Sequence, residues 1–443
     1  MSSFPDEVYR TLIHKISKLA RESASDSSIV IRPGKDFSRK CRLSFTNVLL
    51  IILGLKTKSI NEEMADWRDV TKRIMTSGAF VKARDKINTK VFAKLLYMIN
   101  KAYPCESVFK GYHLIAVDGS DLNIAYNPDD SETFLKSKKS KGINQLHLNC
   151  AYDILSNRYV DAIINGKKKA GEPEAMWKMA ERYPDQDVIF IADRGYPSWN
   201  TMEHIKRNGK YFLIRAMDIH SRSSMLRKFN LPDTEFDLDV EAKLTTRQSR
   251  ELKKDPEYRF LSTTSVFDFK DEMKPFYIVN YRVVRFKIES DSEIKYECII
   301  TNLDRKDFPA EVIKKLYNMR WGIEVSFREL KYSADISVQH AKRKNRILQE
   351  AWAKMILYNL SMIITMHVKI PEGRRKRKYT YILNRTAAIH YVRDYISQKR
   401  KGGHCPPDLE EMISKEIIPV RPGRSNPRKM KPQSLVPFNY RFS

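Results

Sequence analysis

Two apolar runs of strand length each lead into an aspartate, and they constrain the fold more than any other feature of this chain. The run "LIAVDGS" reaches Asp118 and then Gly119, and the run "VIFIADRG" reaches Asp193, Arg194 and Gly195. Apolar runs of this length predict buried strands. In open α/β sheets, sites form beyond the carboxyl ends of strands, where both aspartates are expected to lie. Each aspartate taken singly fits a turn or capping role equally well.

Residues 110–216 alternate between strand-like and helix-like segments. The strand-like runs are "YHLIAVDGSDLNI", "QLHLNCAYDI", "NRYVDAIIN", "DVIFIADRGY" and "GKYFLIRAM", and the helix-like runs are "EPEAMWKMAERY" and "SWNTMEHIKRNG". The order of three strands, helix, strand, helix and strand predicts a mixed α/β fold. Residues 217–305 become strand-like again after a polar stretch, and we interpret them as a β-rich insertion.

A third carboxylate, Glu324, lies in a segment with helical periodicity. The segment "LYNMRWGIEVSFRELKY" follows Pro309 and Glu311, residue types that favour the first turn of a helix. Apolar residues recur along one side of the segment. We therefore expect a single amphipathic helix that begins near Pro309 and is docked by one side.

The polar residues of this segment form a narrow stripe beside its apolar side. At ~100° per residue, Tyr317, Arg320, Glu324 and Lys331 fall within about 60° of one another. Arg320, Glu324 and Arg328 also have the four-residue spacing of surface ion pairs, each worth about 0.3–0.5 kcal/mol. The polar stripe is therefore either a functional surface or, as the alternative, a solvated helix face.

The three acids together suit metal-dependent phosphodiester chemistry. Carboxylates alone would repel a phosphate, whereas two Mg²⁺ ions about 3.5–4 Å apart can activate a nucleophile and stabilise the leaving oxygen. Roughly +4 from two ions is balanced by about −3 from three carboxylates and −1 from one phosphate. We therefore predict that Asp118, Asp193 and Glu324 bind Mg²⁺, with Mn²⁺ able to substitute. Asp121, Asp153 and Asp161 are of the same residue type, but they lie past the glycine turn or at a hairpin.

The stripe has a spacing that is known from one group of enzymes. It reads Tyr, two residues, Arg, three residues, Glu, six residues, Lys. With "AVDGSDL" and "IADRGY", this spacing resembles the signature of the insertion-sequence-four family of DDE transposases. The resemblance implies a ribonuclease-H-like mixed-sheet core with a β-rich insertion before the glutamate helix. The segment "KKKAGEPEAMW" departs from the family's Asn-Glu-Arg pattern, so no role is carried over to it.

The resemblance also implies roles for residues and partners. It implies a metal-binding catalytic triad and a set that holds phosphates of the transposon end, namely Asp118, Asp193 and Glu324, and then Tyr317, Arg320 and Lys331. Such an enzyme binds terminal inverted repeats, cuts both ends, joins them to target DNA and pairs two subunits in a homodimer. The alternatives are a nuclease of the same fold without strand transfer and a domesticated DNA-binding protein that no longer cuts. The complete set of motif residues disfavours the non-cleaving protein.

Positive charge is in large excess and points to double-stranded DNA as the partner. Lys and Arg number 81 against 54 acids, a net charge of +27. Residues 1–105 are interpreted as a small helical DNA-binding domain, with Ser44 and Thr76 as helix caps. Lys82, Arg84 and Lys86 are predicted to form its basic, DNA-binding face. A generic helical cap is an equally weighted alternative.

The rest of the chain is assigned to two further segments. Residues 306–370 are expected to hold the glutamate helix and the last part of the catalytic core, after its first part in 106–216. Residues 371–443 form a basic C-terminal region that contains "RRKRKY" and the tail "PVRPGRSNPRKMKP", which either touches DNA or is solvated.

Cysteine spacing and hydropathy predict the compartment. The five cysteines are far apart without a C-x-x-C, and the nine histidines are dispersed, which argues against zinc fingers and a disulfide framework. The apolar run "WAKMILYNLSMIITMHV" is interrupted by Lys354 and Asn359, so a buried helix is expected and no membrane partner. The polar start of the chain lacks the features of a signal peptide. A cytoplasmic, nucleoid-associated bacterial protein is expected.

Two aromatic residues are candidates for stacking on a base that is pulled out of the duplex near the cut. Trp321 lies beside the polar stripe, and Tyr296 lies on the last strand of the insertion. Stacking contributes about 1–3 kcal/mol per base. For Trp321, ordinary core packing is the favoured alternative.

Overall fold

The computed structural model describes most of the chain. The described residues are 3–39, 41–67, 75–137, 141–169, 171–262, 264–271, 274–288, 295–372, 378–401 and 408–421. Most of the basic run at 374–379 and the tail from residue 422 onward lie outside the described residues, so their predicted DNA contact stays a prediction.

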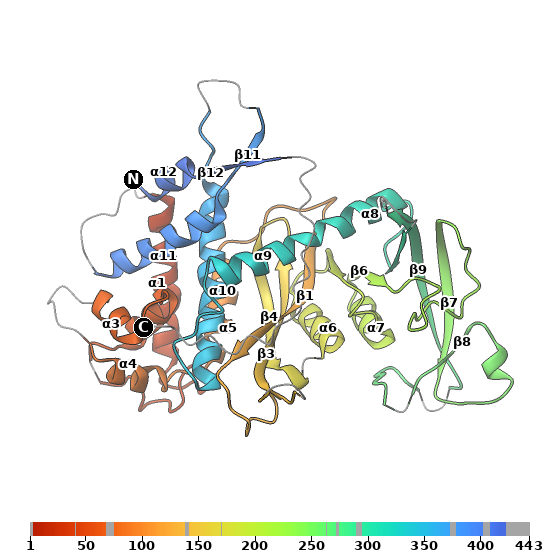
Figure 1. Ribbon diagram of the computed structural model, residues 1–443, viewed down its shortest axis with the longest axis horizontal. Helices are drawn as coiled ribbons and strands as arrows, with labels where there is room; N and C mark the ends of the chain where they lie inside the picture. The colour runs from red at the N-terminus through yellow and green to blue at the C-terminus, as the bar shows by residue number, and fades with distance from the viewer. Residues whose placement is uncertain are drawn as a thin grey trace.

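A mixed sheet forms the centre of the molecule (Figure 1). Its first strands and the helices between them follow the predicted order: β1 (His113–Ile124), β3 (Ile143–Asp153), β4 (Arg158–Gly166), α6 (Glu172–Arg182), β5 (Val188–Ala192), α7 (Trp199–Arg207) and β6 (Tyr211–Ala216). The spatial order of these strands is β4-β3-β1-β5-β6. Strand β3 is antiparallel to both β1 and β4, whereas β5 and β6 run parallel to β1. The mixed α/β class predicted from the sequence is thus confirmed.

The strands of the insertion extend this same sheet. They are β7 (Phe236–Thr245), β8 (Tyr258–Phe260), β9 (Tyr277–Ile288) and β10 (Lys295–Thr301), with short helix η2 at Leu252–Lys254. β10 pairs with both β6 and β9, so the order continues β6-β10-β9-β7-β8. With the short strand β2 (Phe134–Leu135) beside β3, the described residues contain one ten-stranded sheet. The short helix η1 (Lys167–Lys169) follows β4.

Both faces of the central strands are buried, which explains their continuous apolar sequences. All five residues of β5 are buried. Phe190 packs in one core cluster with residues of α6 and α7, while Ile189 and Ile191 pack in another that includes α8. A strand covered on both sides has no polar face, so its sequence is apolar without alternation.

The segment that carries Glu324 forms two helices and not the single helix that we expected. They are α8 (Ala310–Met319) and α9 (Trp321–Tyr332), which run end to end in Figure 1. At Arg320 the backbone stays helical, with φ −50° and ψ −31°, but the hydrogen bonds across it tighten to a three-residue spacing. Gly322 follows, and glycine weakens a helix by about 1 kcal/mol relative to alanine. The change at Arg320 is therefore local, and the two helices still present the polar stripe together.

A helical unit flanks the sheet on the side opposite to the insertion (Figure 1). Its helices are α1 (Phe4–Glu22), α2 (Phe45–Gly54), α3 (Ile60–Asp66), α4 (Ser77–Arg84), α5 (Lys90–Ala102), α10 (Lys344–His367), α11 (Arg385–Lys401) and α12 (Leu409–Lys415). A small antiparallel sheet of β11 (Thr380–Leu383) and β12 (Ile417–Val420) accompanies them. The predicted caps are confirmed: Ser44 accepts from the N–H of Asn47 and Thr76 from the N–H of Ala79, both at 3.2 Å.

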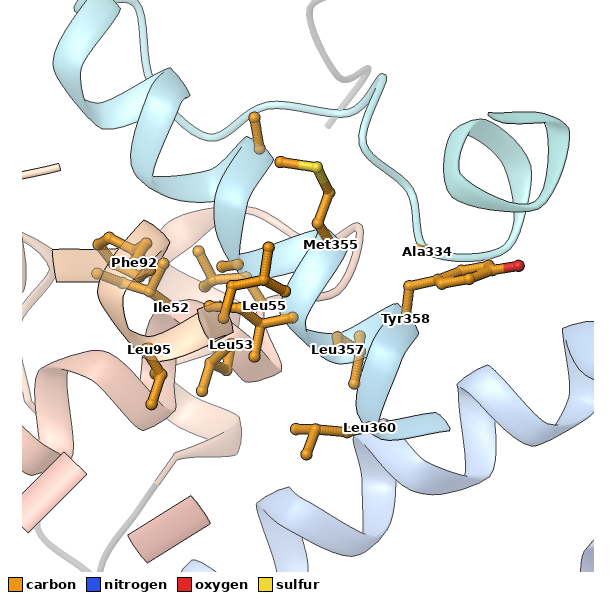
Figure 2. Close-up of a cluster of buried hydrophobic side chains, with 14 of the residues drawn as sticks. Ile52, Leu53, Leu55, Phe92, Leu95, Ala334, Met355, Leu357, Tyr358 and Leu360 are labelled. Atoms are coloured by element: carbon orange, nitrogen blue, oxygen red, sulfur yellow. The ribbon is translucent and has the colours of Figure 1, made fainter. Parts of the chain in front are cut away.

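Helix α10 is the buried centre of this unit, although it follows the glutamate helix in sequence. Figure 2 shows Leu357 and Leu360 of α10 beside Leu53 of α2 and Leu95 of α5, all within one core cluster. The N-terminal helices therefore share a core with residues about 260 to 310 positions later in the chain. As expected, Lys354 and Asn359 are buried with the rest of α10. Within the described residues, every helix is too short or too polar to span a bilayer.

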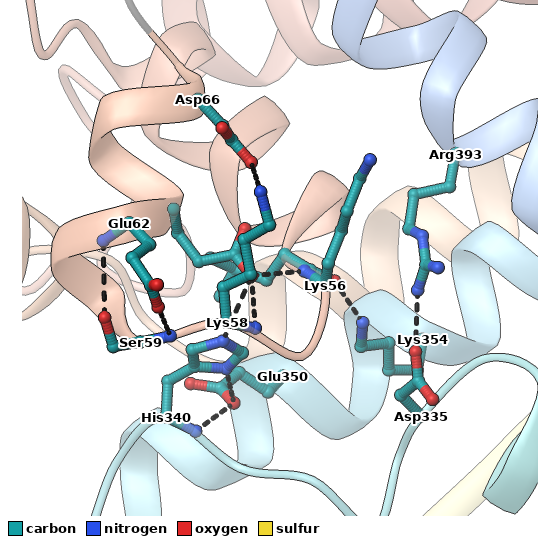
Figure 3. Close-up of polar contacts among 12 residues, drawn as sticks. Lys56, Lys58, Ser59, Glu62, Asp66, Asp335, His340, Glu350, Lys354 and Arg393 are labelled. Atoms are coloured by element: carbon teal, nitrogen blue, oxygen red, sulfur yellow. Dashed lines mark hydrogen bonds and ion pairs between the residues drawn. The ribbon is translucent and has the colours of Figure 1, made fainter. Parts of the chain in front are cut away.

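Buried polar contacts add specific links between α10 and its surroundings (Figure 3). Glu350 accepts hydrogen bonds from the backbone N–H of His340 at 2.9 Å and lies 3.1 Å from the His340 ring. The ammonium group of Lys354 donates to the carbonyl oxygen of Leu55. Because a buried polar group is costly without a partner, these bonds fix how α10 is placed among the N-terminal helices.

Candidate active site

Asp118 and Asp193 lie side by side on neighbouring parallel strands. The last paired residues of β1 and β5 are Val117 and Ala192, so each aspartate is the next residue of its strand. The expectation that the strand itself ends at Asp118 is wrong, because the antiparallel pairing of β1 with β3 continues to Ile124. The parallel pairing does stop there, at the carboxyl end of β5. The two carboxylates meet at this end of the two central strands, which we call the sheet edge.

The two helices α8 and α9 bring the polar stripe to the same edge. The Tyr317 hydroxyl donates to Asp193 Oδ1 at 3.1 Å. The guanidinium of Arg320 donates to Glu324 Oε1 at 2.8 Å, and its Nη1 lies 3.9 Å from Asp118 Oδ2. Arg320 is only 6% exposed, which excludes the alternative of a solvated helix face. All three acids therefore converge around one buried cation.

Burial and charge act differently on the two aspartates. Burial raises the pKa of Asp118 to about 6. Burial also acts to raise the pKa of Asp193, but the N–H of Arg194 and the guanidinium groups of Arg320 and Arg215 outweigh it and lower that pKa overall. A nearby divalent cation would favour the ionised form of both. A divalent cation bound beside Asp118 and Asp193 would thus be stabilised by both carboxylates.

The donor set fits hard divalent cations. Carboxylate oxygens are the ligands that Mg²⁺ prefers. The bond from the N–H of Gly119 uses Oδ1 of Asp118, and the bonds from Arg194 and Tyr317 use Oδ1 of Asp193, so these bonds do not use Oδ2 of either aspartate. Among the described residues, the three acids do not form one ligand set within 4.8 Å, since the Arg320 guanidinium lies between two of them. Two ions that share one carboxylate do not require such a compact set.

Two flanking residues of the site were missed by the sequence analysis. Arg215 of β6 lies 3.6 Å from Asp193 Oδ1 and 3.1 Å from Glu297 Oε1 of β10. Burial raises the pKa of Glu297. The one available signal was a basic residue inside the apolar run "YFLIRAM". The pairing of β6 with the last strand of the insertion brings the two residues to the triad.

Lys331 lies about two turns beyond Glu324 on the same helix and is half-buried. Burial lowers the pKa of Lys331, and the negative charges of Asp121 and Asp118 oppose that effect. The ammonium group of Lys331 therefore lies close enough to Asp118 and Asp121 for their charges to act on it.

A polar network around the buried His147, beside the triad, was also missed. His147 Nδ1 lies 2.6 Å from Asp121 Oδ1, and His147 Nε2 lies 3.2 Å from Glu172 Oε1. Lys167 is 2.8 Å from the same Asp121 oxygen. Burial acts to lower the pKa of His147, but its contacts with the Asp121 and Glu172 carboxylates outweigh burial and raise that pKa overall. Glu172 begins α6, the segment to which the resemblance assigned no role.

The network explains why glycine follows each motif aspartate. A Cβ at Gly119 would lie 2.4 Å from His147 Nε2, and a Cβ at Gly195 would lie 2.7 Å from Glu172 Oε2. Glu172 therefore lies between the segments that carry the two aspartates. A side chain at Gly119 would meet the buried His147 ring, so β1 and the network pack closely there, whereas at Gly195 the end of the Glu172 side chain can move aside.

The two stacking candidates have different surroundings. Trp321 is 50% exposed, so its expected core packing is wrong, and the position of Trp321 at the start of α9 turns its ring outward. Tyr296 is half-buried, and the Arg285 guanidinium carbon lies 3.8 Å from the centre of its ring. Arg285 thus already covers a face of Tyr296, whereas the Trp321 ring is accessible.

The predicted basic face of α4 is only partly present. Arg84 is 1% exposed and forms an ion pair of 2.8 Å with Glu350 of α10, so its predicted DNA contact is wrong. Lys82 is exposed, and the Lys86 ammonium group lies 5.5 Å from the Phe37 ring. Periodicity in a short helix cannot distinguish a buried arginine from an exposed one when the partner acid lies elsewhere in the chain.

Comparisons with known proteins agree on the class of domain. A family model described as a transposase DDE domain matches residues 109–360, which is more than half of the chain. A curated protein of Geobacillus stearothermophilus, named "Probable transposase for insertion sequence element IS5377", is 22% identical over 185 residues. That alignment covers 41% of this chain and 41% of the relative.

One solved structure is also similar. It is described as the cryo-EM structure of the piggyBac transposase synaptic complex with hairpin DNA. The sequence identity is 11%, the TM-score is 0.42, and the alignment covers 97% of this chain and 88% of that chain.

Proposed function

This chain belongs to the transposase DDE domain family, and we propose that it is the transposase of an insertion sequence of the insertion-sequence-four type. In this proposal it binds terminal inverted repeats as a homodimer inside the bacterial cell. It cuts both ends in a Mg²⁺-dependent reaction and joins the 3′-OH to target DNA. The observation that carries the proposal is the meeting of Asp118, Asp193 and Glu324 around Arg320 at one sheet edge.

The arrangement of the central strands supports a ribonuclease-H-like core. Three antiparallel strands are followed by two that run parallel to the first, with a helix before each of the last two. The acids sit at the edge where the parallel pairing ends. This edge faces α8 and α9, so a DNA strand would enter between the sheet edge and the polar stripe.

Each residue of the site has a proposed task. Asp118, Asp193 and Glu324 would hold two Mg²⁺ ions, which activate the nucleophile and stabilise the leaving oxygen when they are bound. Arg320 and Lys331 would pair with phosphates next to the scissile bond, and Arg320 would exchange an acid for a phosphate as its partner. A guanidinium suits this exchange because it binds carboxylate and phosphate with the same planar fork. Tyr317 would hold Asp193 in position through its hydroxyl.

The activity can be tested with the DNA that flanks the reading frame. Purified protein, Mg²⁺ and a linear DNA carrying both flanking termini should give cleavage at the repeats and joined products with a second DNA. Cleavage without joining would instead indicate a nuclease, and binding without cleavage would indicate a non-cleaving DNA-binding protein. Either of these two outcomes would contradict the proposal.

Replacing Arg320 or Lys331 by alanine should affect cleavage much more than DNA binding. Each residue touches at most the phosphates beside the scissile bond, and a misplacement of about 1 Å there can cost ~10²-fold in rate. The slope of end affinity against salt should fall by at most about 0.9 for one lost contact. Single-turnover cleavage of saturated complexes measures the first effect, with Arg320→Lys as the charge-preserving control. Unchanged cleavage by both alanine variants would show that the stripe does not position DNA.

Replacing Gly119 by alanine should slow cleavage about 10²-fold. The new Cβ would lie 2.4 Å from the buried His147 ring, so β1 or the His147 network must move and Asp118 moves with it. Gly78→Ala is the matched control, because a Cβ at that position of α4 meets nothing within 4 Å. Single-turnover cleavage should distinguish the two variants. If Gly119→Ala cut DNA as fast as Gly78→Ala, the close packing at Gly119 would have no part in placing Asp118.

The exposed ring of Trp321 is proposed to stack on an unpaired base at the transposon end. Trp321→Ala should then slow cleavage, and an abasic site at the terminal nucleotide should restore much of the rate because no base remains to be moved. The measurement compares intact and abasic ends with both proteins. If no abasic position improved the variant, base stacking by Trp321 would be excluded.

A further inference from the structure

We propose that Cys105, His113 and Asp153 form a zinc site at the end of the sheet away from the catalytic acids. One ligand atom from each residue, the sulfur, a ring nitrogen and a carboxylate oxygen, lies within 4.8 Å of the others. His113 begins β1, Asp153 ends β3, and Cys105 lies between α5 and β1. The site would fasten the segment that joins the helical unit to the sheet.

The Asp153 carboxylate is oriented by the backbone and leaves one oxygen for a ligand. Its Oδ1 accepts from the N–H groups of Leu155 and Ser156, both at 2.9 Å. Its Oδ2 is buried and has no hydrogen-bond partner among the described residues, and Asp153 is 0% exposed. A buried carboxylate oxygen without a partner costs free energy, and a bound cation would remove that cost.

The imidazole of His113 is presented in the same way. Its Nδ1 is also buried and without a hydrogen-bond partner in the described part of the chain, and it lies 3.9 Å from Asp153 Oδ2. Its other nitrogen, Nε2, faces Asp185 Oδ2 at 3.9 Å. Metal-bound histidines characteristically direct their second nitrogen toward a carboxylate or a carbonyl, which sets the tautomer. Nδ1 is therefore the nitrogen available to a metal.

The ligand types select zinc over the magnesium expected at the catalytic acids. Thiolate and imidazole ligands suit Zn²⁺, whereas Mg²⁺ requires oxygen ligands. Zinc bonds of about 2.0–2.3 Å place tetrahedral ligands roughly 3.3–3.7 Å apart. The two ligand atoms of His113 and Asp153 are 3.9 Å apart, so a shift of about half an ångström brings this pair to the required spacing. The side chain of Cys105 must also turn, because its sulfur now lies 3.4 Å from the carbonyl oxygen of Ser107.

A fourth ligand position is open on one side. A cavity of about 260 Å³ is lined by Cys105 and Ser156, among other residues. The Ser156 hydroxyl is buried and has no partner among the described residues. Either this hydroxyl or a water in the cavity can complete four-fold coordination. The zinc site is separate from the catalytic acids, since Asp118 lies five residues farther along β1, about 17 Å away.

Cobalt substitution tests the site with the full-length chain. We expect purified protein to bind one Zn²⁺ tightly, and Co²⁺ in its place to give a tetrahedral visible spectrum with a thiolate charge-transfer band in the near ultraviolet. Cys105→Ser should abolish that band and weaken binding at least tenfold, and Asp153→Asn and His113→Gln should also weaken it. Cys41→Ser is the matched control, because Cys41 is an exposed thiol elsewhere in the chain. The same titration in an Asp118→Asn background excludes binding at the catalytic acids.

A second measurement avoids variants that fold poorly. Zinc should protect Cys105 of the wild-type chain from alkylation, as read by mass spectrometry, while Cys41 stays reactive as the internal reference. Zinc should also raise the melting temperature by a few degrees. A cobalt complex without a thiolate band, or equal alkylation of Cys105 with and without zinc, would overturn the proposal.

Discussion

Replacing Asp118 or Asp193 by asparagine, or Glu324 by glutamine, is expected to reduce cleavage of transposon ends by more than about 10²-fold. Loss of a residue that only supports a metal ligand costs about 10–100-fold, so loss of a ligand should cost more. Each substitution keeps the shape of the side chain and removes its charge. The remaining carboxylates cannot then balance two divalent ions and a phosphate.

The same three variants should still bind DNA ends. The acids contribute repulsion to a phosphate in the absence of metal, so affinity should stay within about threefold of the wild type or improve slightly. A gel assay separates the two steps: end binding in Ca²⁺, then single-turnover cleavage after transfer to Mg²⁺. Asp129→Asn is a control, because Asp129 is an exposed aspartate in the loop after β1. Near-normal cutting by any of the three variants would remove that residue from the proposed triad.

Arg84→Ala is expected to destabilise the fold by about 3–5 kcal/mol, the usual cost of leaving one partner of a buried ion pair alone. The Arg84 guanidinium donates to Glu350 at 2.8 Å, to Gln349 at 3.0 Å and to the carbonyl of Arg346 at 2.8 Å. Burial acts to raise the pKa of Glu350, but Arg84 and His340 outweigh it and hold that pKa at about 2. Without Arg84, a charged carboxylate stays buried at neutral pH with its main counterion removed.

Urea unfolding of Arg84→Ala and Lys82→Ala measures the difference. Lys82 is exposed on the same helix, so Lys82→Ala should change stability by no more than about 0.5 kcal/mol. If Lys82 contacts a phosphate, its variant should instead lower the slope of DNA affinity against salt by about 0.9. Should Arg84→Ala be as stable as the wild type and flatten that slope, Arg84 would be the DNA contact that periodicity suggested.

Local periodicity predicted the parts of the site that lie within single elements. The positions of Tyr317, Arg320 and Glu324 on a common stripe follow from residues per turn, and the break at Arg320 did not disturb them. The two aspartates were found because each follows an apolar run, and the parallel pairing of β1 with β5 stops just before both of them. The order of strands and helices in 110–216 followed from the same patterns.

The other features of the fold and the site depend on contacts between segments that are distant in sequence. Local periodicity gives no information about such contacts. The partner acid of Arg84 is 266 residues away, on a helix that sequence order assigned to the catalytic core. His147 and Glu172 meet only because β3 and the start of α6 pass beside Gly119 and Gly195. In the sequence, the insertion appears as a group of strands separate from the core. In the structure, β10 pairs with β6 and thereby places Glu297 next to Arg215.

The same limit applies to the proposed zinc ligands. Cys105 and His113 are close in sequence, but Asp153 reaches them only through the antiparallel pairing of β1 and β3. The dispersed cysteines and histidines therefore gave no sign of a metal-binding cluster.

Metal rescue at the scissile phosphate tests most directly whether the three acids act through bound metal ions. A sulfur atom replaces the leaving oxygen at the end of the transposon, and single-turnover cleavage is measured in Mg²⁺ and in Mn²⁺. Because Mg²⁺ binds sulfur poorly and softer ions bind it better, cleavage should fall about 10²-fold or more in Mg²⁺ and recover in Mn²⁺. The recovery should be absent in Asp118→Asn, Asp193→Asn and Glu324→Gln. Equal cleavage of the sulfur and oxygen substrates in Mg²⁺, or recovery in Mn²⁺ with all three variants, would contradict catalysis by metal ions held at Asp118, Asp193 and Glu324.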